Sequence, residues 1–545
     1  MFVRKKKNRS GTVSVVIVRK QLGAYSEIRT VGTGSSASEI SKLVSEGKDW
    51  IHRQNAIGDI FDNYEQRETE REKVEFFFNN IENILLDGAG QLLNRVYGMI
   101  GFDRIKDTVL KELVIARICQ PRSKAATVEY LKSHFDEDID LNKIYRYLDV
   151  LQLIHQLEVQ KISVEHTRKI LGGKIGIVFY DVTTLYFETD YGDELRKAGF
   201  SKDGKHSQPQ IVLGLLVSSG TNNLAKMNFD QEPQIVLGLL VSSGGYPLSY
   251  SIHEGNKYEG HTMLPAVEDF VKKFDLKEFV VVADSGLMNK DNIAELEEKK
   301  YKYIIGAKIK SESKDVKAWI LSLEKQHGSF YELGKLPTSR LIVSYSDNRA
   351  KKDRYNREKG IRRLEKEYKT ETLTKDKVNK RGYNKFLEIS DDIKVNINYD
   401  KVREDESWDG LKGYMTNTDL PAKQVYEEYS GLWQVESAFR VTKGTLDLRP
   451  MFHFTKKRIE AHICICFVAY KVYKEFERLL KIANINFSVD KVLDIARTIT
   501  TIRVRLPEAR QTISRTMLIT DRHKSISCLF DDEFWKNQLA EKRMK

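Results

Sequence analysis

A series of short segments between residues 172 and 310 constrains the fold more than any other feature of this sequence. These segments are dense in β-branched and aromatic residues and have the lengths of strands: 175–187, 210–217, 246–252, 279–283 and 303–308. Helical patterns occupy 262–274 and 289–299, between the later segments. Three strands in succession, followed by alternating helices and strands, predict an α/β fold with a mixed sheet flanked by helices.

The regions on either side of this series have their own character. Residues 12–18 and 28–33 predict a β-hairpin, and a capping stretch at 36–39 begins a helix that we expect to end near residue 54. We therefore divide the chain into six regions: a β-hairpin plus helix (1–55), a mainly helical region (56–170), the first part of the core sheet (171–310), a basic insertion with strand-like pieces (311–420), the rest of the core with a long helix (421–480) and a helical C-terminal tail (481–545).

One segment of the sheet region occurs twice. PQIVLGLLVSSG at 209–220 recurs unchanged at 233–244, a shift of 24 residues. Repeat folds need about three units or more, so two copies indicate a tandem duplication within an ordinary domain. One position in the sheet cannot hold both copies. We expect the second copy to hold it, because GGYP at 244–247 turns it directly into the next strand, and we expect the first to be extruded or to lie at a sheet edge.

Positive charge is concentrated in one stretch of the predicted insertion. The chain of 545 residues has a formal net charge of +12 and a pI near 9.1, which favours a polyanionic partner. Residues 349–385 hold 15 Lys or Arg against 6 Asp or Glu. Such a run is often a solvated helix face, but this excess, with tyrosines interspersed, also suits phosphate contacts. The candidate DNA-binding residues here are Lys351, Lys352, Arg354, Arg362 and Arg363.

The sequence argues against several other classes of protein. No apolar run approaches the roughly 18 residues that span a bilayer, and the run at 15–18 is too short for a signal peptide. We therefore expect a cytoplasmic protein without a membrane partner. The four cysteines fit reduced thiols, and Cys464 and Cys466 fit core packing better than a metal site. The lack of a phosphate-binding loop motif predicts no nucleotide cofactor.

Two carboxylates follow apolar strand-like runs. Asp181 comes directly after 177–180, and Asp284 comes directly after 279–283. A carboxylate at a buried strand costs several kcal/mol unless it is paired or binds a cation. One such residue is often a strand-end cap or a turn residue. Two of them, each ending a run of the same sheet, indicate a site, because sites collect at strand ends in α/β sheets.

A third carboxylate lies in a predicted helix that spans residues 426–443. Tyr429, Glu436 and Lys443 are spaced by seven residues, which places them within about 40° of one another on one helix face. Trp433 and Arg440 fall on the same face. The pattern is compatible with a surface helix that carries a Glu436/Arg440 pair. It also suits a helix that presents Glu to a metal and Lys and Arg to phosphate.

Together these motifs resemble those of bacterial insertion-sequence DDE transposases. YDVTT at 180–184, VVADSG at 281–286 and Tyr429-x6-Glu436-x6-Lys443 resemble the three acidic motifs, the last being similar to the Tyr-Arg-Glu-Lys signature of the insertion-sequence-four group. WDGLKGYMTN at 408–417 resembles the strand that returns from the inserted domain. LRPMFH at 448–453 and RIEAH at 458–462 are most similar to the insertion-sequence-1634 subgroup. Leu432 stands where the signature has Arg, and Arg440 is the candidate replacement.

The resemblance implies an RNase-H-like core with a β-containing insertion before the catalytic helix and a DNA-binding region within 56–170. It implies two Mg²⁺ ions, with Mn²⁺ as a substitute, held by Asp181, Asp284 and Glu436. The reaction would be hydrolysis at the transposon ends, followed by attack of the freed 3′-OH on target DNA. The partners would be double-stranded DNA with terminal inverted repeats, target DNA and a second copy of the chain, at the bacterial nucleoid. Hard divalent cations suit these oxygen ligands better than zinc does.

The resemblance also assigns secondary roles. Lys443, Tyr429 and Arg440 would face the scissile phosphate, Thr183 would support the metal ligands, and Trp433 would either pack in the core or stack on a displaced base. The remaining candidates are more typical of ordinary structure: His253 and Glu254 of a loop and helix cap, His453 and His462 of packing or DNA-backbone contact. Two alternatives remain, a DNA-binding derivative that the duplication has impaired and an RNase-H-like nuclease without strand transfer.

Overall fold

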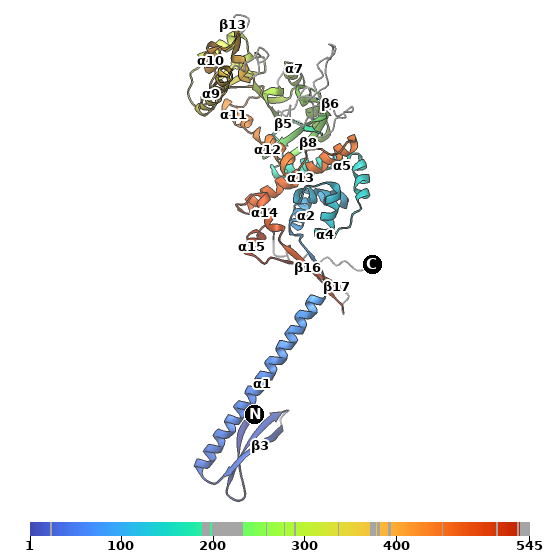
Figure 1. The fold of residues 1–545 in the computed structure, drawn as a ribbon, viewed down its shortest axis with the longest axis vertical. Coiled ribbons are helices and arrows are strands. Elements are labelled where there is room, and N and C mark those ends of the chain that lie inside the picture. Colours follow the sequence, from blue (N-terminus) through green and yellow to red (C-terminus); the bar gives the residue numbers. More distant parts are fainter. Residues whose placement is uncertain are drawn as a thin grey trace. The chain divides into compact units, whose positions relative to one another are not determined.

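The computed structural model divides the chain into two compact units (Figure 1). One comprises Met1–Ile84, Thr501–Met517 and Glu533–Lys545, and the other comprises Leu85–Thr500 and Leu518–Asp532. The structure describes residues 1–21, 24–187, 197–198, 233–257, 259–276, 278–287, 290–335, 337–370, 378, 382–390, 394–449, 451–507, 511–530 and 534. Within these residues, every helix is too short or too polar to cross a membrane.

The first unit begins with an antiparallel sheet of β1 (Phe2–Lys7), β2 (Val13–Gln21) and β3 (Ala24–Gly34). The predicted hairpin corresponds to β2 and β3. Helix α1 (Ala37–Asn79) follows, and a capping box of Ser36 and Glu39 begins it. The predicted helix end near residue 54 was wrong, and the boundary at 55 falls inside α1. Residues 55–79 contain no proline, and their single glycine, Gly58, weakens a helix without ending it.

A second sheet of this unit joins distant parts of the chain. It has the order β17-β16-β4, with β4 at Ile81–Leu85, β16 at Thr500–Leu506 and β17 at Gln511–Met517. Strands β16 and β17 lie in the region 481–545, which was expected to be helical. The sequence could not show this sheet, because β16 pairs with a strand more than 400 residues away, β4.

The second unit has a helical part built around one apolar helix, α13 (Lys456–Ile482), which packs against α2, α3 and α5. The apolar residues of α13 are buried around most of its circumference. The helices of this part are α2 (Gly88–Ile100), α3 (Thr108–Cys119), α4 (Lys124–Phe135), α5 (Leu141–Ile170), α14 (Val489–Ala496) and α15 (Asp521–Ser527). The predicted helical region and the C-terminal helices thus share one core.

The other part of the second unit is a sheet that has nine strands in the described residues. Its order is β11-β12-β15-β10-β9-β5-β7-β6, with β8 also paired to β7. The strands are β5 (Ile177–Tyr186), β6 (Lys197–Ala198), β7 (Pro233–Ser242), β8 (Pro247–Glu254), β9 (Val280–Ala283), β10 (Lys302–Ala307), β11 (Phe330–Gly334), β12 (Arg340–Tyr345) and β15 (Leu411–Thr416). Strands β5, β9 and β10 run parallel, and the remaining pairs are antiparallel. The predicted mixed α/β sheet is confirmed.

Helices α6 (Met263–Phe274), α7 (Lys290–Glu298) and α8 (Lys314–Ser322) connect strands of this sheet. One face of the sheet forms a hydrophobic core, in which Val178, Tyr180 and Val182 of β5 pack with α6 residues such as Phe270.

The second copy of the duplicated segment forms β7. It pairs with β5 over its whole length and with β8 on its other side, joined to β8 by the turn that contains Gly244 and Gly245. This is the position predicted for the second copy. The first copy, 209–220, lies outside the described residues.

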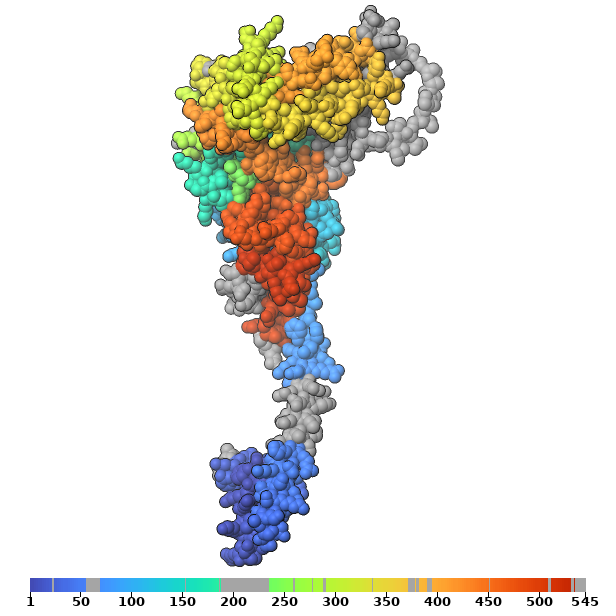
Figure 2. Space-filling view, turned by 90° about the vertical axis from the view of Figure 1, so that its left-hand side faces the viewer, coloured from blue at the N-terminus to red at the C-terminus, as the bar shows by residue number. Residues whose placement is uncertain are grey.

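The insertion predicted at 311–420 is smaller than expected. Strands β11, β12 and β15 come from this range but belong to the central sheet. The inserted segment is the part between β12 and β15, which contains α9 (Asp347–Lys369), β13 (Leu387–Ser390), β14 (Lys394–Ile397) and α10 (Tyr399–Glu406), with a small core of its own around Leu364. Figure 2 shows much of this segment, in yellow, at the surface. The strand-like pieces could be seen in the sequence, but their pairing partners could not.

Candidate functional site

The two aspartates lie on neighbouring parallel strands. β5 and β9 pair at 177–180 with 280–283, and Tyr180 opposite Ala283 is the last pair. Asp181 and Asp284 each come directly after it, so both leave the parallel ladder at the same level. The sequence placed Asp181 at the end of an apolar run, but the strand does not end there: β5 continues to Tyr186 alongside β7. The strand register therefore brings together two residues that are about a hundred positions apart.

The alternation of side chains along β5 fixes the face on which Asp181 lies. Val178, Tyr180 and Val182 point into the core with α6, so Phe179, Asp181 and Thr183 belong to the opposite face. Gly431 packs against this face: a Cβ built there would lie 2.5 Å from Cζ of Phe179. Thr183 is buried two residues beyond Asp181, where its supporting role stays a prediction.

The helix that carries Glu436 is broken into three parts. The sequence predicted one helix over 426–443, and this was wrong: α11 (Ala422–Ser430) and α12 (Trp433–Arg440) meet at a tight turn, and a π-helical turn follows at Val441–Thr445. The tight turn has 3₁₀-type bonds, with the Leu432 N–H donating to the Tyr429 carbonyl at 3.1 Å. Gly431 lies at this turn and packs so closely on Phe179 that a Cβ would not fit. The residues predicted to share one helix face therefore lie on three segments: Tyr429 on α11, Glu436 and Arg440 on α12, and Lys443 in the π-helical turn.

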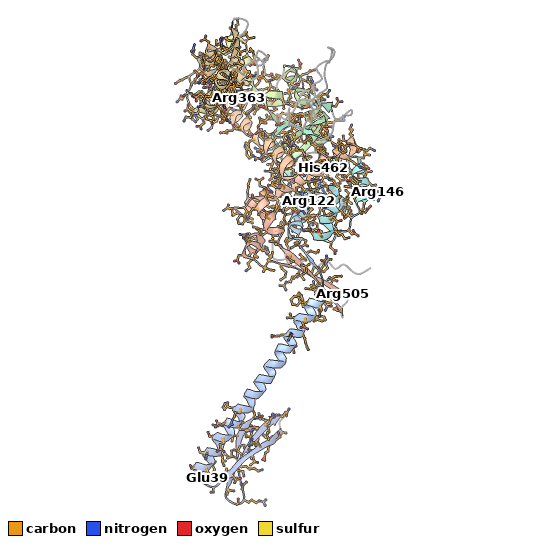
Figure 3. The ribbon with its side chains drawn as sticks, in the orientation of Figure 1. Glu39, Arg122, Arg146, Arg363, His462 and Arg505 are labelled. Carbon is orange, nitrogen blue, oxygen red and sulfur yellow. The ribbon has the colours of Figure 1, made fainter. Side chains whose placement is uncertain are left out.

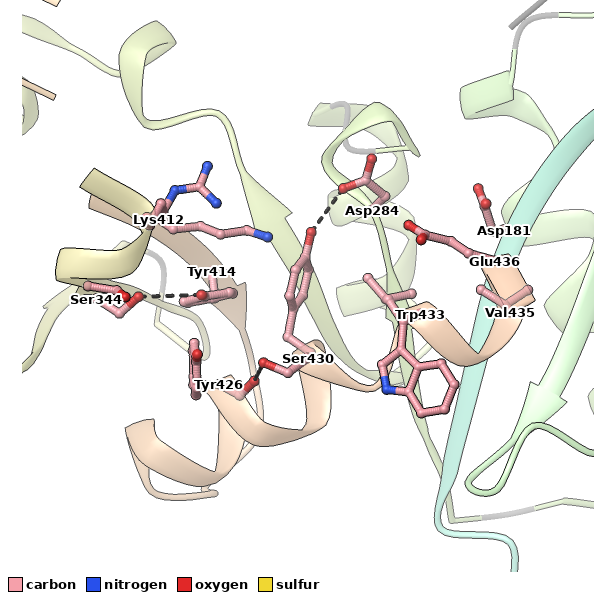
Figure 4. Close-up of a pocket in the computed structure, with 14 residues that line it drawn as sticks. Asp181, Asp284, Ser344, Lys412, Tyr414, Tyr426, Ser430, Trp433, Val435 and Glu436 are labelled. Carbon is pink, nitrogen blue, oxygen red and sulfur yellow. Dashed lines mark hydrogen bonds between the residues drawn. The ribbon is translucent and has the colours of Figure 1, made fainter. Parts of the chain in front are cut away.

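One cavity of about 600 Å³ brings the three carboxylates together (Figure 4). Asp181 and Asp284 line it from the sheet, and Glu436 lines it from α12. The other residues of its wall are polar or aromatic for the most part: Ser344, Ser346, Arg349, Lys412, Tyr414, Tyr426, Tyr429, Ser430, Leu432, Trp433 and Val435. Arg440 and Lys443 are not among these lining residues. Arg440 donates to Ser437 Oγ at 3.2 Å, and Lys443 Nζ lies 6.0 Å from the Phe439 ring centroid.

Tyr429 is tied directly to the acidic site. Its hydroxyl donates to Asp284 Oδ1 at 2.9 Å. Burial, reinforced by the charge of Asp284, raises the pKa of Tyr429 far above its usual value, so the phenol stays protonated. Gly306 of β10 makes room for it, since a Cβ there would lie 2.5 Å from the Tyr429 hydroxyl oxygen. This role of Gly306 could not be inferred from the sequence, because it depends on which strand lies beneath α11.

Lys412 and Arg349 are cavity residues that the sequence analysis missed. Lys412 Nζ lies 4.3 Å from the ring centroid of Tyr429 and 5.9 Å from that of Tyr414. Burial, together with the positive charge of Arg349, lowers the pKa of Lys412, while Asp284 and Glu436 act in the opposite direction. A lysine inside the otherwise apolar strand 411–416 was the available signal. The basic run containing Arg349 was noticed, but its contact with the acidic site was not.

The donor set suits hard divalent cations. The cavity is lined by three carboxylates and several hydroxyls, without His or Cys, and such oxygen ligands favour Mg²⁺ or Mn²⁺ over zinc. Within the described residues, no three His, Cys, Asp or Glu side chains lie close enough together to hold one ion. The three carboxylates therefore share a cavity without converging on one point. Asp284 and Glu436 are both exposed to solvent there.

The secondary candidates lie elsewhere. His253 at the end of β8 is not among the lining residues; burial and Lys257 lower its pKa to about 4, and its Nε2 lies 3.0 Å from Ser251 Oγ. Glu254 is the last residue of β8. The rings of His453 and His462 lie 5.1 Å apart, and His462 is buried in α13 (Figure 3).

Cysteines 464 and 466 pack in the core. Both are free thiols buried in α13, and burial raises the pKa of each. They therefore have the environment of inert packing residues, as the sequence indicated.

The five basic candidates of the insertion all lie on α9, and all are exposed: Lys351, Lys352, Arg354, Arg362 and Arg363 (Figure 3). Arg357 on the same helix is buried and forms a bidentate pair with Asp409 at 2.5 and 2.8 Å, so it anchors α9 to the unit. The charge run thus divides into a structural arginine and a solvent-facing basic surface.

Comparison with known proteins supports a nucleic-acid enzyme over part of the chain. Residues 230–471 match a family model described as a transposase DDE domain. This range includes Asp284 and Glu436 and begins after Asp181. The search of curated proteins returned no match. Over the matched range, the chain resembles transposases.

Two solved structures show weak likeness. A piggyBac transposase synaptic complex with hairpin DNA aligns at 9% identity and a TM-score of 0.35, over 71% of this chain and 68% of that chain. A Mos1 transposase paired-end complex with the left transposon end aligns at 13% identity and a TM-score of 0.14, over 33% of this chain and 53% of that chain. Both TM-scores are too low to show a shared fold.

Proposed function

We propose that this chain is a DDE transposase that cleaves DNA at the ends of an insertion sequence and joins the freed 3′-OH to target DNA. One observation carries the proposal: carboxylates from β5, from the end of β9 and from α12 line a single cavity. The match of residues 230–471 to a transposase DDE domain supports it. We assign the chain to the insertion-sequence-four group and its 1634 subgroup on the motifs quoted above.

Asp181, Asp284 and Glu436 would hold two Mg²⁺ ions, for which Mn²⁺ would substitute. When bound, such ions polarise the scissile phosphate and activate the attacking water or 3′-OH. Tyr429 keeps Asp284 in place through its hydrogen bond and remains a donor at neutral pH. Thr183, buried beside Asp181 on the same strand, would support that carboxylate.

We infer that the core of the sheet is RNase-H-like. The support is the parallel set β5-β9-β10 with β7 and β8 antiparallel at one side, and the two aspartates at the point where β5 and β9 part. The segment between β12 and β15 would be the insertion that precedes the catalytic helix. Helices α2 to α5 would include the DNA-binding region expected within 56–170.

The DNA surface would extend from the cavity to α9. Trp433 lines the cavity yet is 62% exposed, which suits stacking on a base better than core packing. Arg440 and Lys443 would contact flanking phosphates, with Arg440 in place of the signature arginine that Leu432 replaces. Neutralising several of the exposed basic residues of α9 (Lys351, Lys352, Arg354, Arg362 and Arg363) should flatten the salt dependence of DNA affinity. An unchanged slope would mean that this face is merely solvated.

Two copies of the chain would act together, because an element has two ends that must be cut and joined in one event. The expected place is the bacterial cytoplasm at the nucleoid. The mass of the complex with terminal-repeat DNA tests the stoichiometry; one chain on one end would contradict the dimer.

The decisive experiment is cleavage of duplexes taken from the DNA that flanks the gene. The unmodified chain should nick them with Mg²⁺, and Asp284→Ala should abolish nicking while DNA binding persists. The matched control is Asp291→Ala, an exposed aspartate on α7, which should cleave normally. Binding without any nicking by the unmodified chain would support the impaired derivative. Nicking without joined products from pre-cleaved ends would support a nuclease.

A further inference from the structure

The cavity has two ends of opposite charge. Asp181 and Glu436 lie on one side, whereas Lys412 and Tyr414 come from the other, and the Lys412 side chain extends toward Tyr429 and Asp284 between them (Figure 4). The carboxylate end is accounted for by the proposed metal ions. The basic end is a separate feature, since it comes from β15 and from the first turn of α9, neither of which supplies a carboxylate to this wall.

Lys412 is a half-buried cation close enough to Asp284 and Glu436 for their charges to act on its pKa. Its ammonium group lies over the rings of Tyr429 and Tyr414, at 4.3 and 5.9 Å from their centroids. In the part of the chain that the structure describes, it makes no ion pair or hydrogen bond. Ring faces attract a cation and fix its position, but they do not neutralise it. A charge held in this way favours an anionic ligand in the cavity.

Arg349 provides a second cation on the same wall. It is exposed, and its ion pair joins Nε to Asp353 at 3.7 Å, which leaves the terminal N–H groups of the guanidinium for another partner. The hydroxyl of Ser346 beside it lines the cavity and makes no capping bond to α9. Guanidinium and ammonium groups with a nearby hydroxyl are the donors that bind phosphate in proteins.

We propose that Lys412 and Arg349 form a subsite for the backbone phosphate next to the scissile one. The inference rests on the proposed function and assigns two residues to it that lie outside the acidic motifs. Consecutive nucleotides of a DNA strand rise about 3.4 Å, so a strand with one phosphate at the carboxylates brings its neighbour into the same cavity. The subsite offsets the repulsion between three carboxylates and the DNA strand, and it positions the scissile bond.

The first test measures the salt dependence of DNA affinity without divalent metal. The probe is a 40-base-pair duplex from the DNA that flanks the gene (about four helical turns). The slope of log affinity against log salt is negative, and Lys412→Gln and Arg349→Gln should each make it shallower by about 0.9. Lys401→Gln, an exposed lysine of α10, should leave the slope unchanged, and Lys412→Arg should restore it. Unchanged slopes in both Gln variants overturn the subsite.

The second test removes the phosphate charge instead. A duplex carries one uncharged methylphosphonate beside the scissile phosphate. Cleavage by the unmodified chain should fall about tenfold or more, as expected for the loss of a charged hydrogen bond. Lys412→Gln should lose as much on natural DNA and little more on the modified duplex, because both changes remove the same contact. If the loss from Lys412→Gln multiplies with the loss from the methylphosphonate, Lys412 only supports Tyr429, and the subsite is overturned.

The two arms separate failure of the subsite from failure of the proposed function. If the unmodified chain cleaves no DNA with Mg²⁺, the proposed function fails, and the salt slopes alone decide whether Lys412 and Arg349 bind phosphate. If it cleaves normally but neither variant changes the slope, the subsite fails and the transposase proposal stands.

Discussion

Two glutamates on consecutive α-helices of the second unit have opposite surroundings. Glu436 on α12 is exposed at the cavity. Glu475 on α13 is 1% exposed and accepts two hydrogen bonds from Arg478, at 2.9 and 2.6 Å, with His166 at 3.7 Å. Burial alone would raise the pKa of Glu475, but Arg478 and His166 outweigh it and hold the pKa at about 2.

The same contrast holds for two lysines. Lys471 on α13 is fully buried and donates to the Ser163 carbonyl at 3.1 Å and to Thr167 Oγ1. Lys412 at the cavity makes no hydrogen bond or ion pair in the described residues; its ammonium group lies against two ring faces, within range of the charges of Asp284 and Glu436. Buried charges must be paired, because an unpaired one costs several kcal/mol. Charged groups whose hydrogen bonds are all made within the chain therefore stabilise the fold. Charged groups beside a cavity with unused hydrogen-bonding capacity are available to a ligand.

The largest expected effect comes from Glu436→Gln. The change removes one proposed metal ligand from an exposed position. Cleavage of the flanking-DNA duplex should fall by about 10³-fold or more, equivalent to about 4 kcal/mol of transition-state stabilisation. The denaturant midpoint should shift by less than the equivalent of about 0.5 kcal/mol. If Glu436→Gln instead lowered stability strongly and left cleavage per folded molecule unchanged, Glu436 would be a structural residue and not a metal ligand.

Glu475→Gln should have the opposite profile. Removing the charge of the buried Glu475 weakens its two hydrogen bonds from Arg478, whose side chain is 33% exposed, and should lower the free energy of unfolding by about 2 kcal/mol. Cleavage per folded molecule, measured at low temperature, should stay unchanged. Glu477→Gln on the same helix, where the glutamate side chain is 34% exposed against 1% for Glu475, should cost about 1 kcal/mol or less. Equal losses for the two variants would show that the network around Glu475 adds nothing.

Gly306→Ala tests whether the hydrogen bond between Tyr429 and Asp284 sets the geometry of the site. The new methyl would displace the Tyr429 hydroxyl, and cleavage should fall about tenfold, near 1.4 kcal/mol, as for one lost hydrogen bond to a charged group. Tyr429→Phe should cause a similar loss. The double variant should be only slightly worse than Tyr429→Phe alone, because Phe lacks the nearest atom, and the remaining contacts of the new Cβ, with the ring Cζ and with Ser285 N, are both at 3.1 Å. Additive losses would place the effect of Gly306 elsewhere in β10.

The pH dependence of stability probes Lys471. Burial lowers the pKa of this lysine to about 7 from its usual 10.5. Below pH 7 the Lys471 amine is protonated in both the folded and the unfolded chain. Above pH 7 only the unfolded chain keeps this proton. The free energy of unfolding should therefore rise with pH, by at most about 1.4 kcal/mol per pH unit. Lys471→Met should remove this rise between pH 7 and 8.5, measured as the difference in unfolding midpoint from the unmodified chain. Parallel curves for both proteins would mean that Lys471 folds in its charged form.

Much of the site could be predicted because it depends on local pattern. Asp181 and Asp284 interrupt apolar strands, and Glu436 lies in an amphipathic helical segment; each signal is contained in about ten residues. Lys412 and Gly306 could not be assigned this way. Their roles depend on β15 and β10 lying under Tyr429, and a single sequence does not specify the register between strands far apart in the chain.

The errors in the fold have the same physical origin. The predicted helix over 426–443 assumed uniform rotation per residue, but the structure has a tight turn between α11 and α12, where Gly431 packs against Phe179. This contact joins segments some 250 residues apart, so no local propensity reports it. The basic insertion was expected to be one region, yet β11, β12 and β15 complete the central sheet. Tertiary pairing decided both cases.

The smallest expected effect comes from removing the duplication. Deleting residues 209–232 joins Gln208 to Pro233 and leaves every residue of β7 and its pairing with β5 and β8. The connection between β5 and β7 is roughly halved, which should raise the free energy of unfolding by about 0.6 kcal/mol through lower loop entropy. Cleavage by the shortened chain should equal or exceed that of the full chain.

The duplication also supplies its own matched pair of variants. Leu213 in the first copy corresponds to Leu237, which is buried in β7. Leu213→Asp should shift the unfolding midpoint by less than the equivalent of about 0.5 kcal/mol, whereas Leu237→Asp in the shortened chain should unfold it, since a carboxylate would enter the sheet without a partner. If the deletion or Leu213→Asp destabilises the protein by about 2 kcal/mol or more, the first copy carries part of the fold. In that case, activity would depend on a segment that arose by copying and not on the cavity alone.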